Sequence, residues 1–156
     1  MIFVTVGMHN QGFDRLIEKC DLIAGTTEEK MIMQKGATNY CPKNAEFFDF
    51  TSYEEILKLI KQSRIVITHD GAGSILNCLL NRKTTIVVPR LKEFNECKYE
   101  NKLDLALELQ RQNKIYLVKD IDLLNLELIV GAKAIYDFDS ENSLLTNIKK
   151  YIEKLG

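Results

Sequence analysis

The chain has little excess charge, no long apolar run and few residues that commonly bind metals. Its 21 basic and 22 acidic residues nearly balance, which argues against a strongly electrostatic partner such as a nucleic acid. No stretch approaches the roughly 20 apolar residues that a membrane-spanning helix needs. The first apolar run stops at Gly7 and lacks a basic segment before it, so it is not typical of a signal peptide.

Histidine and cysteine are also sparse. His9 and His69 are the only histidines, and no pattern of carboxylates accompanies them. The four cysteines, at positions 20, 41, 78 and 97, have no paired metal-binding spacing and no secretory context. This usage favours free thiols in a cytoplasmic protein. We therefore expect no metal centre and no cofactor.

The most informative feature that is present is a strand followed by a glycine turn. Residues 64–68 form a short, β-branched run typical of a buried parallel strand. Gly71 and Gly73 follow, and the segment from Ser74 onward has the pattern of a helix. A helix N-terminus presents unpaired amides and the positive end of its dipole, so this turn is a candidate phosphate site. His69 adds a titratable group at its mouth.

Strands and helices alternate along the chain, which predicts one α/β domain. Strands are expected at 2–6, 31–34, 47–50, 64–68, 85–88 and 115–118. Four helices are expected between them: one over 12–24, one that begins after Ser52, one that follows the glycine turn and ends at about Leu80, and one over 96–112. This alternation predicts a Rossmann-like parallel sheet with helices on both faces. Ligands of such sheets lie beyond the carboxyl ends of the strands. At 156 residues the chain is expected to be a single domain, 1–156.

The segment 121–156 is less defined, with a loosely apolar helical part and a terminal helix expected over about 140–155. Apolar residues of that helix form a stripe at positions 144, 145, 148, 152 and 155. Two interpretations stay open. The stripe packs on the domain's own sheet, or it docks on a partner.

Five motifs then occur in an order typical of one family. They are FVTVG at 3–7, FDRLI at 13–17, QKG at 34–36, THDGAGS at 68–74 and IVVPR at 86–90. Together, over about residues 1–118, they resemble the C-terminal, donor-binding half of the GT-B glycosyltransferases of family 28. The chain is similar in particular to the small catalytic subunits of two-part enzymes. These include the N-acetylglucosaminyltransferase of dolichol-linked glycan synthesis and bacterial pairs that make exopolysaccharide and capsule.

The resemblance implies a function shared between two chains. The small subunit would be a single nucleotide-sugar-binding domain that binds a UDP-sugar donor. A membrane-anchored second subunit would bind the lipid-linked acceptor and hold the small subunit at the inner face of the membrane. Two alternatives stay open: a non-catalytic binding or regulatory subunit that keeps the fold, and a phosphate- or nucleotide-binding enzyme unrelated to glycosyl transfer.

The resemblance also assigns residues to roles. His69 and Glu96 are expected to be catalytic, with His69 lining the cleft and Glu96 facing the donor sugar. The expected substrate-binding residues are Gly7, Met8, Gly71, Ala72, Gly73, Ser74, Asn77, Arg90, Asn101 and Lys102. For several of them a structural role is the alternative. His69 would then be held at a strand end, Ser74 would cap a helix, and Arg90 would be a solvated surface side chain.

Three departures from the family pattern stand out. Asp70 occupies a place where alanine or glycine is usual, beside the expected phosphate site. Asn77 stands where relatives often carry an acidic residue for the ribose hydroxyls, so it cannot make the same charge-assisted hydrogen bond. Cys97, Asn101 and Lys102 replace the residues with which bacterial members contact the donor sugar.

Overall fold

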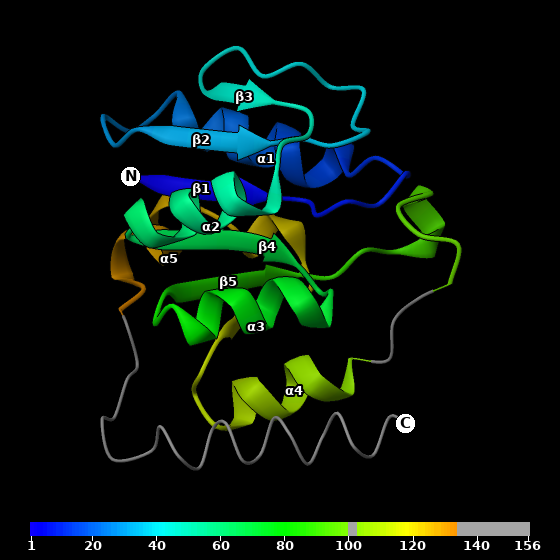
Figure 1. Ribbon diagram of the computed structural model, residues 1–156, viewed down its shortest axis with the longest axis vertical. Coiled ribbons are helices and arrows are strands. Elements are labelled where there is room, and N and C mark those ends of the chain that lie inside the picture. Colours follow the sequence, from blue (N-terminus) through cyan, green and yellow to red (C-terminus); the bar gives the residue numbers. More distant parts are fainter. Residues whose placement is uncertain (100–102, 134–156) are drawn as a thin grey trace.

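The computed structural model describes residues 1–99 and 103–133 (Figure 1). Six strands all pair in parallel, in the spatial order β3-β2-β1-β4-β5-β6. The strands are β1 (Ile2–Thr5), β2 (Met31–Gln34), β3 (Glu46–Phe48), β4 (Ile65–His69), β5 (Thr84–Val88) and β6 (Tyr116–Leu117). The helices are α1 (Asp14–Ala24), α2 (Tyr53–Gln62), α3 (Ala72–Leu80), α4 (Asp104–Arg111) and α5 (Leu126–Gly131), with short 3-10 turns η1 (Lys92–Phe94) and η2 (Ile121–Leu123).

The strand order contains a topological switch point between β1 and β4. From β1 the chain moves outward through β2 and β3, then returns to the other side of β1 and continues through β4, β5 and β6. In doubly wound sheets the loops on either side of such a point diverge and leave a crevice for a ligand. The predicted Rossmann-like sheet is confirmed.

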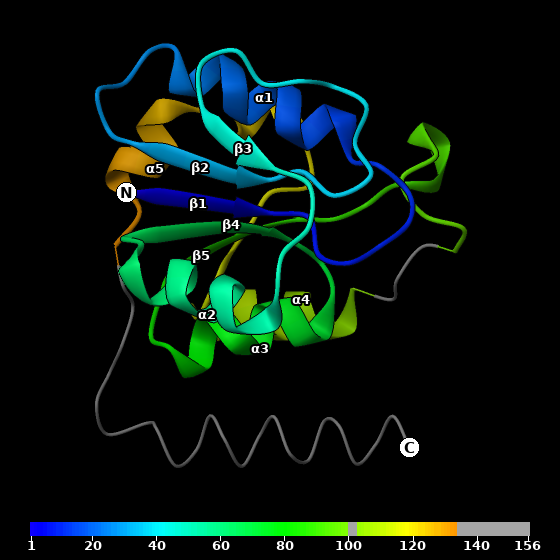
Figure 2. The same cartoon turned by 45° about the horizontal axis from the view of Figure 1, so that its top comes forward.

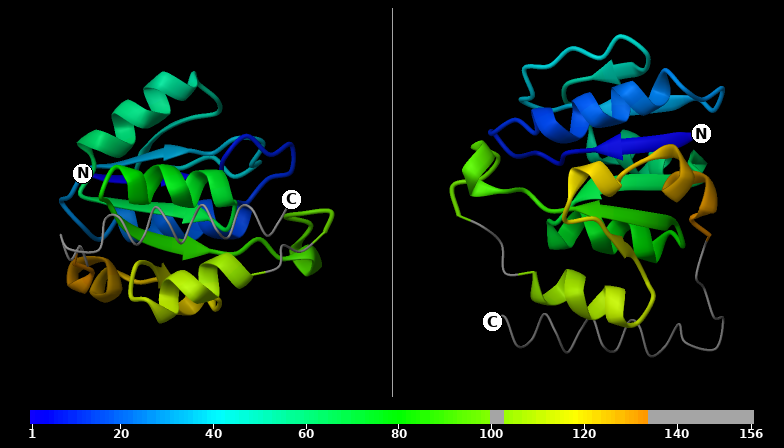
Figure 3. Two further views of the ribbon diagram at one scale, coloured as in Figure 1. Left: turned by 60° about the horizontal axis from the view of Figure 1, so that its bottom comes forward. Right: turned by 180° about the vertical axis from the view of Figure 1, so that it is seen from behind.

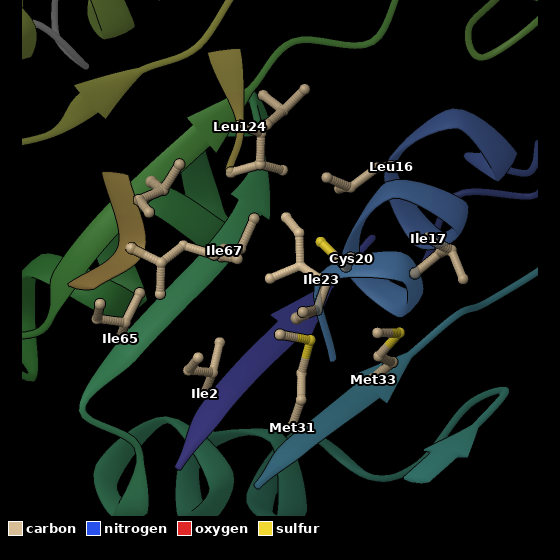
Figure 4. Packing of buried hydrophobic residues seen from close by; sticks show 14 of the residues in the cluster. Ile2, Leu16, Ile17, Cys20, Ile23, Met31, Met33, Ile65, Ile67 and Leu124 are labelled. Atoms are coloured by element: carbon tan, nitrogen blue, oxygen red, sulfur yellow. The ribbon is translucent and has the colours of Figure 1, made fainter. Parts of the chain in front are cut away.

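Helices cover both faces of the sheet (Figures 2 and 3). Helices α1 and α5 lie on one face, and α2, α3 and α4 lie on the other. Successive side chains of β1 point to opposite faces of the sheet. Ile2 and Val4 belong to the core beneath α1, while Phe3 packs with Ile60 and Val66 on the other face. Figure 4 shows the α1 side, where Leu16 and neighbouring helix residues meet the side chains of β1, β2 and β4.

The main error of the sequence prediction is the helix expected over 96–112. Helix α4 begins only at Asp104, and residues 96–99 are not helical. Asn95 takes a left-handed conformation with φ of 55°, and the Glu96 carboxylate accepts a hydrogen bond from the Leu91 amide at 2.8 Å. These two features turn the chain back after η1 and prevent helix formation there. The smaller difference is β3, which spans 46–48 where a strand over 47–50 is predicted.

Two further expectations concern the rest of the chain. The terminal helix predicted over 140–155, with its apolar stripe, lies outside the described residues. All four cysteines lie within them, and they form no disulfide. In the part of the chain that the structure describes, none of the helices has the length and apolar character needed to span a bilayer.

Candidate functional site

A cavity of about 350 Å³ opens at the carboxyl edge of the sheet, at the switch point between β1 and β4. This volume lies within the range of small-molecule sites. Its wall is formed by β1, β2, β4, the helices α2 and α3, and the loops that adjoin them. The lining residues are Thr5, Gly7, Met8, Gln34, Thr51, Tyr53, Ile56, Ile60, His69, Gly71, Gly73, Ser74 and Asn77. The cavity therefore brings together seven of the residues expected from the sequence: Gly7, Met8, His69, Gly71, Gly73, Ser74 and Asn77.

His69 is held in one tautomer by its neighbours. The Gly71 amide donates to Nδ1 at 3.0 Å, so in the neutral ring the hydrogen sits on Nε2. Nε2 then donates to Ser74 Oγ at 2.9 Å. Burial, helped by the nearby charges of Arg90 and His9, lowers the His69 pKa to about 4. The imidazole is consequently neutral at physiological pH, and the Ser74 hydroxyl keeps its own hydrogen available for a ligand.

Two glycines make room for this ring. A Cβ added to Gly7 would lie 2.4 Å from His69 Nε2, and one added to Gly71 would lie 2.3 Å from Cε1. Gly7 also has a φ of 74°, which L side chains rarely adopt. Both glycines thus serve the packing of His69 directly. Gly73 differs from them, because a Cβ there would meet nothing within 4 Å and would point into open space.

The N-terminus of α3 faces the same space. Gly71 is its N-cap residue and provides no side-chain cap. The first bond of the helical pattern runs from Ile75 N to Gly71 O at 3.1 Å. The amides of Ala72, Gly73 and Ser74 precede that bond and have no partner within the helix. This is the arrangement that binds phosphates in many nucleotide-binding proteins.

Asn77 and Tyr53 connect α3 and α2 at the wall of the cavity. The Tyr53 hydroxyl donates to Asn77 Oδ1 at 3.0 Å, although the tyrosine side chain is 60% exposed. With Oδ1 engaged in this way, Asn77 presents its amide nitrogen as the remaining donor. Tyr53 was not predicted from the sequence, where it reads only as the first residue of an amphipathic helix.

Gln34 is a second residue that the sequence analysis did not assign to the site. It is almost completely buried at the end of β2, and its side chain bonds to Thr5, to Gly7 and to the Asp49 carbonyl. The signal that was available is its position in the QKG motif at 34–36, since a buried amide just before a glycine turn requires several partners.

Arg90 and Asp70 lie beside the cavity but do not line it. Arg90 is 4% exposed, and its guanidinium donates to the backbone carbonyls of Val6, Gln11, Gly12 and Glu96 at 2.8–3.1 Å. Asp70 is buried as well, and its Oδ1 accepts from the Arg90 amide at 3.2 Å. Arg90 therefore ties the β1–α1 loop to the loop after β5. It is not the solvated side chain of one interpretation. Its Nη1 and Nη2 donate to carbonyls of the protein, while the buried Nε has no hydrogen-bond partner.

Glu96 also lies away from the cavity. It is 2% exposed, and Arg15 holds both of its carboxylate oxygens, at 2.9 and 3.0 Å. The pair lines a separate hollow between α1, η1 and η2. Asn101 and Lys102, which were expected to accompany Glu96 at the donor sugar, lie outside the described residues. Ala72 stands at the start of α3, next to the cavity wall.

The cavity wall carries no formal charge within the described part of the chain: none of its lining residues is a lysine, an arginine, an aspartate or a glutamate. The described residues also contain no cluster of three or more histidine, cysteine or carboxylate side chains that could hold a metal ion. The polar groups that face a ligand are therefore amides, hydroxyls and a neutral imidazole.

Residues 1–153 match the glycosyltransferase family 28 C-terminal domain. The chain belongs to this family. Its relatives include a protein of Borreliella burgdorferi named UDP-N-acetylglucosamine--N-acetylmuramyl-(pentapeptide) pyrophosphoryl-undecaprenol N-acetylglucosamine transferase, 26% identical over 121 residues. The mouse UDP-N-acetylglucosamine transferase subunit ALG13 is 29% identical over 125 residues. The matches cover 77% and 73% of this chain but only 32% and 10% of those two proteins.

Solved structures agree on the fold. The glycotransferase of kitacinnamycin superposes with a TM-score of 0.62 at 16% identity, and the match covers 96% of this chain and 37% of that one. At this level of identity the likeness concerns architecture alone. The six-stranded parallel sheet with its helices is that of one half of a GT-B glycosyltransferase, and the predicted family resemblance is confirmed.

Proposed function

We propose that this family 28 chain is the donor-binding catalytic subunit of a heteromeric glycosyltransferase that moves a sugar from a UDP-sugar to a lipid-linked acceptor. The single observation that carries this proposal is the cavity at the switch point, where the N-terminal amides of α3 and the His69–Ser74 hydrogen bond face the same space. A nucleoside diphosphate suits this arrangement because its diphosphate can accept from those amides.

The relatives support the choice of donor and acceptor. The Borreliella protein is named for UDP-N-acetylglucosamine and for an undecaprenol pyrophosphoryl acceptor, and the mouse protein is named as a subunit. This chain spans about a third of the first and about a tenth of the second, by the coverages of 32% and 10%. We infer that the acceptor site belongs to a second, membrane-anchored subunit, and that the chain works in the cytoplasm at the inner face of the membrane.

The chain's own residues would act mainly on the leaving group. Transfer breaks the bond between the anomeric carbon and the β-phosphate oxygen and leaves its electron pair on UDP. The amides of Ala72, Gly73 and Ser74 and the dipole of α3 stabilise that developing charge. Neutral His69 fixes the Ser74 hydroxyl through Nε2, so that its hydrogen points to the phosphate. Asn77, held by Tyr53, faces the ribose.

The acceptor completes the reaction. Its hydroxyl oxygen forms the new bond to the anomeric carbon, and its proton passes to a base. The cavity wall contains no carboxylate in the described residues, and His69 has a pKa of about 4 with both ring nitrogens engaged. We therefore assign the base to the second subunit, in keeping with an active site shared between two chains.

Calorimetry with UDP and two glycine variants tests this proposal. Gly73→Ala introduces a methyl group beside the α3 amides, in space where the protein has nothing within 4 Å. Gly131→Ala is the matched control, because its Cβ also meets nothing within 4 Å but lies in α5. Wild type and Gly131→Ala should bind UDP equally, and Gly73→Ala should bind about tenfold more weakly. Equal affinity of all three, or no binding of UDP by the wild type, would contradict the proposal.

A non-catalytic donor-binding subunit is the second candidate. It is favoured by the place of Glu96, whose carboxylate is paired with Arg15 away from the cavity. The two candidates differ in one measurement. Radiolabelled UDP-sugar given to the purified chain together with its membrane-anchored partner should label the lipid only if the chain belongs to a catalytic pair.

A further inference from the structure

Gln34 makes four hydrogen bonds with one side chain at the floor of the cavity. Its Oε1 accepts from Thr5 Oγ1 at 2.6 Å and from the Gly7 amide at 3.2 Å. Its Nε2 donates to the Gly7 carbonyl at 2.8 Å and to the Asp49 carbonyl at 3.1 Å. The two carbonyls require a donor and the Gly7 amide requires an acceptor, so the orientation of the side-chain amide is fixed.

Two of these partners belong to the same residue. Gln34 holds both the amide and the carbonyl of Gly7, and so fixes the peptide units on either side of its α-carbon. Gly7 is thereby kept at a φ of 74°, with its α-carbon against the His69 ring. The contact chain runs from Gln34 through Gly7 to His69, and from His69 Nε2 to Ser74 Oγ.

The fourth bond extends this arrangement to a second segment of the cavity wall. The Asp49 carbonyl lies in the segment between β3 and α2, and that segment continues to Thr51 and Tyr53, which line the cavity. One buried side chain therefore links the β1–α1 loop to the β3–α2 loop, whose Asp49 carbonyl also accepts from the Gly36 amide at 3.0 Å. Both loops contribute residues to the cavity wall.

We propose that Gln34 is a positioning residue of the donor site, which acts through Gly7 to hold His69 and Ser74 in their ligand-facing arrangement. This inference rests on the proposed function, since it concerns the same cavity. It extends the proposed function by naming a residue outside the predicted site. The donor and acceptor groups of its side-chain amide, and not its size or burial alone, determine the affinity of the cavity for its ligand. A residue that both accepts from and donates to one glycine cannot be replaced by a side chain with acceptors only.

The substitution Gln34→Glu isolates this property. It preserves the shape of the side chain and its two acceptor contacts, but it places a carboxylate oxygen against the Gly7 and Asp49 carbonyls. Gln110→Glu is the matched control, because it makes the same change on the exposed face of α4. Calorimetry with UDP measures the binding, and nitrogen NMR of the imidazole ring reports the tautomer of His69 without any ligand.

We expect Gln34→Glu to bind UDP about tenfold more weakly near pH 8, while Gln110→Glu binds like the wild type. The ring nitrogens should lose the fixed Nε2–H pattern. Because protonation of the introduced carboxyl restores one donor, the affinity of the variant should recover as pH falls from about 8 to about 5.5. The terminal phosphate of UDP also titrates in this range, so the measured quantity is the ratio of variant to wild-type affinity at each pH. His69 stays neutral in the wild type throughout the range, so the recovery of that ratio reports the introduced carboxyl.

Thr5→Val provides a second, milder variant in case Gln34→Glu does not fold. It keeps a β-branched side chain in β1 and removes the hydroxyl that donates to Gln34 Oε1 and accepts from the Gly7 amide at 3.3 Å. Because both bonds belong to the same arrangement around Gly7, it should change the His69 spectrum in the same direction. An unchanged tautomer and unchanged affinity in a folded variant would overturn the proposal, even if its stability fell. If wild type binds no UDP, the proposed function fails, and the ligand-free tautomer still decides the role of Gln34.

Discussion

Asp70 and Arg90 meet at the ends of the neighbouring strands β4 and β5, where Asp70 Oδ1 accepts a hydrogen bond from the Arg90 amide at 3.2 Å. Asp70 is the residue that departs from the family pattern beside the expected phosphate site. Its burial next to the Arg90 guanidinium means that its negative charge is offset within the protein. The departure at position 70 is thus accompanied by an arginine just beyond the end of the adjacent strand β5.

The first prediction concerns Arg90. Arg90→Lys keeps the positive charge but removes the planar guanidinium, which donates to four backbone carbonyls. The lysine side chain is shorter and ends in one ammonium group, which cannot reach all four. We expect the free energy of unfolding to fall by about 3 kcal/mol or more, because several buried carbonyls lose their guanidinium donors. Urea unfolding measures this change. Arg111→Lys, on the exposed face of α4, is the control and should leave the unfolding midpoint unchanged.

The second prediction concerns the contact between Gly7 and His69. Gly7→Ala would bring its Cβ to 2.4 Å from Nε2 in a backbone conformation that disfavours alanine. We expect a loss of unfolding free energy of roughly 2 kcal/mol or more from strain and displacement of the ring. Gly7→Ala in a His69→Ala background relieves the clash, so the combined loss should be smaller than the sum of the single losses. Additive losses in thermal or urea unfolding would refute the contact.

The third prediction is a pH dependence of stability. The folded-state pKa of His69, about 4, lies below its ordinary value of 6.5. Between these values the unfolded chain binds a proton that the native chain does not, so stability falls as pH drops from 6.5 toward 4 and is level above 6.5. The loss should be on the order of 3 kcal/mol for this one group. NMR titration of the His69 ring checks it, and a midpoint near 6.5 would contradict it.

The fourth prediction separates a structural from a catalytic role of Glu96. Glu96→Gln and Arg15→Gln each break the same bidentate pair, so each should lower the free energy of unfolding by about 2–4 kcal/mol. The double variant should lose less than the sum of the two. UDP affinity should stay within about twofold of the wild type in all three. Lost sugar transfer in a Glu96→Gln protein of undiminished stability would instead restore the catalytic role expected from the sequence.

The fifth prediction concerns Tyr53 and Asn77. Tyr53→Phe removes the hydroxyl that holds Asn77 Oδ1, and because Tyr53 is largely exposed, stability should change by less than about 1 kcal/mol. UDP affinity should nevertheless fall by roughly threefold to tenfold, since the Asn77 amide is no longer oriented toward the cavity. Tyr116→Phe removes a hydroxyl bond to Lys133 at a distance from the cavity and should leave the affinity unchanged.

The sequence predicted the sheet well because its signals are local. A β-branched run such as 65–68 and the helical spacing of Phe13, Leu16, Ile17 and Cys20 are readable from neighbouring residues alone. The turn at 69–74 was likewise visible as a strand, a glycine pair and a helix start. Seven of the residues that were expected at the site line one cavity in the structure.

The errors and omissions involve contacts between residues far apart in the chain. The family resemblance assigned Glu96 to the donor sugar, and nothing in the sequence indicated its partner Arg15, which lies 81 positions away. The same carboxylate accepts a hydrogen bond from the Leu91 amide beside the left-handed Asn95, and residues 96–99 are therefore not helical. Gln34 bonds Gly7 across 27 positions, and no periodicity reveals such a bond. A single sequence shows which residues can be buried, but it does not show which buried polar groups satisfy one another.

The uncharged wall of the cavity has a consequence for the solution conditions under which it would bind the proposed UDP-sugar donor. A site built from lysines and arginines loses its attraction for a diphosphate as added salt screens their charges. Among the residues that the structure describes, this wall offers peptide amides, hydroxyls and a neutral ring at short range. Donor binding should therefore persist at an ionic strength that would release the same nucleotide from a cationic surface.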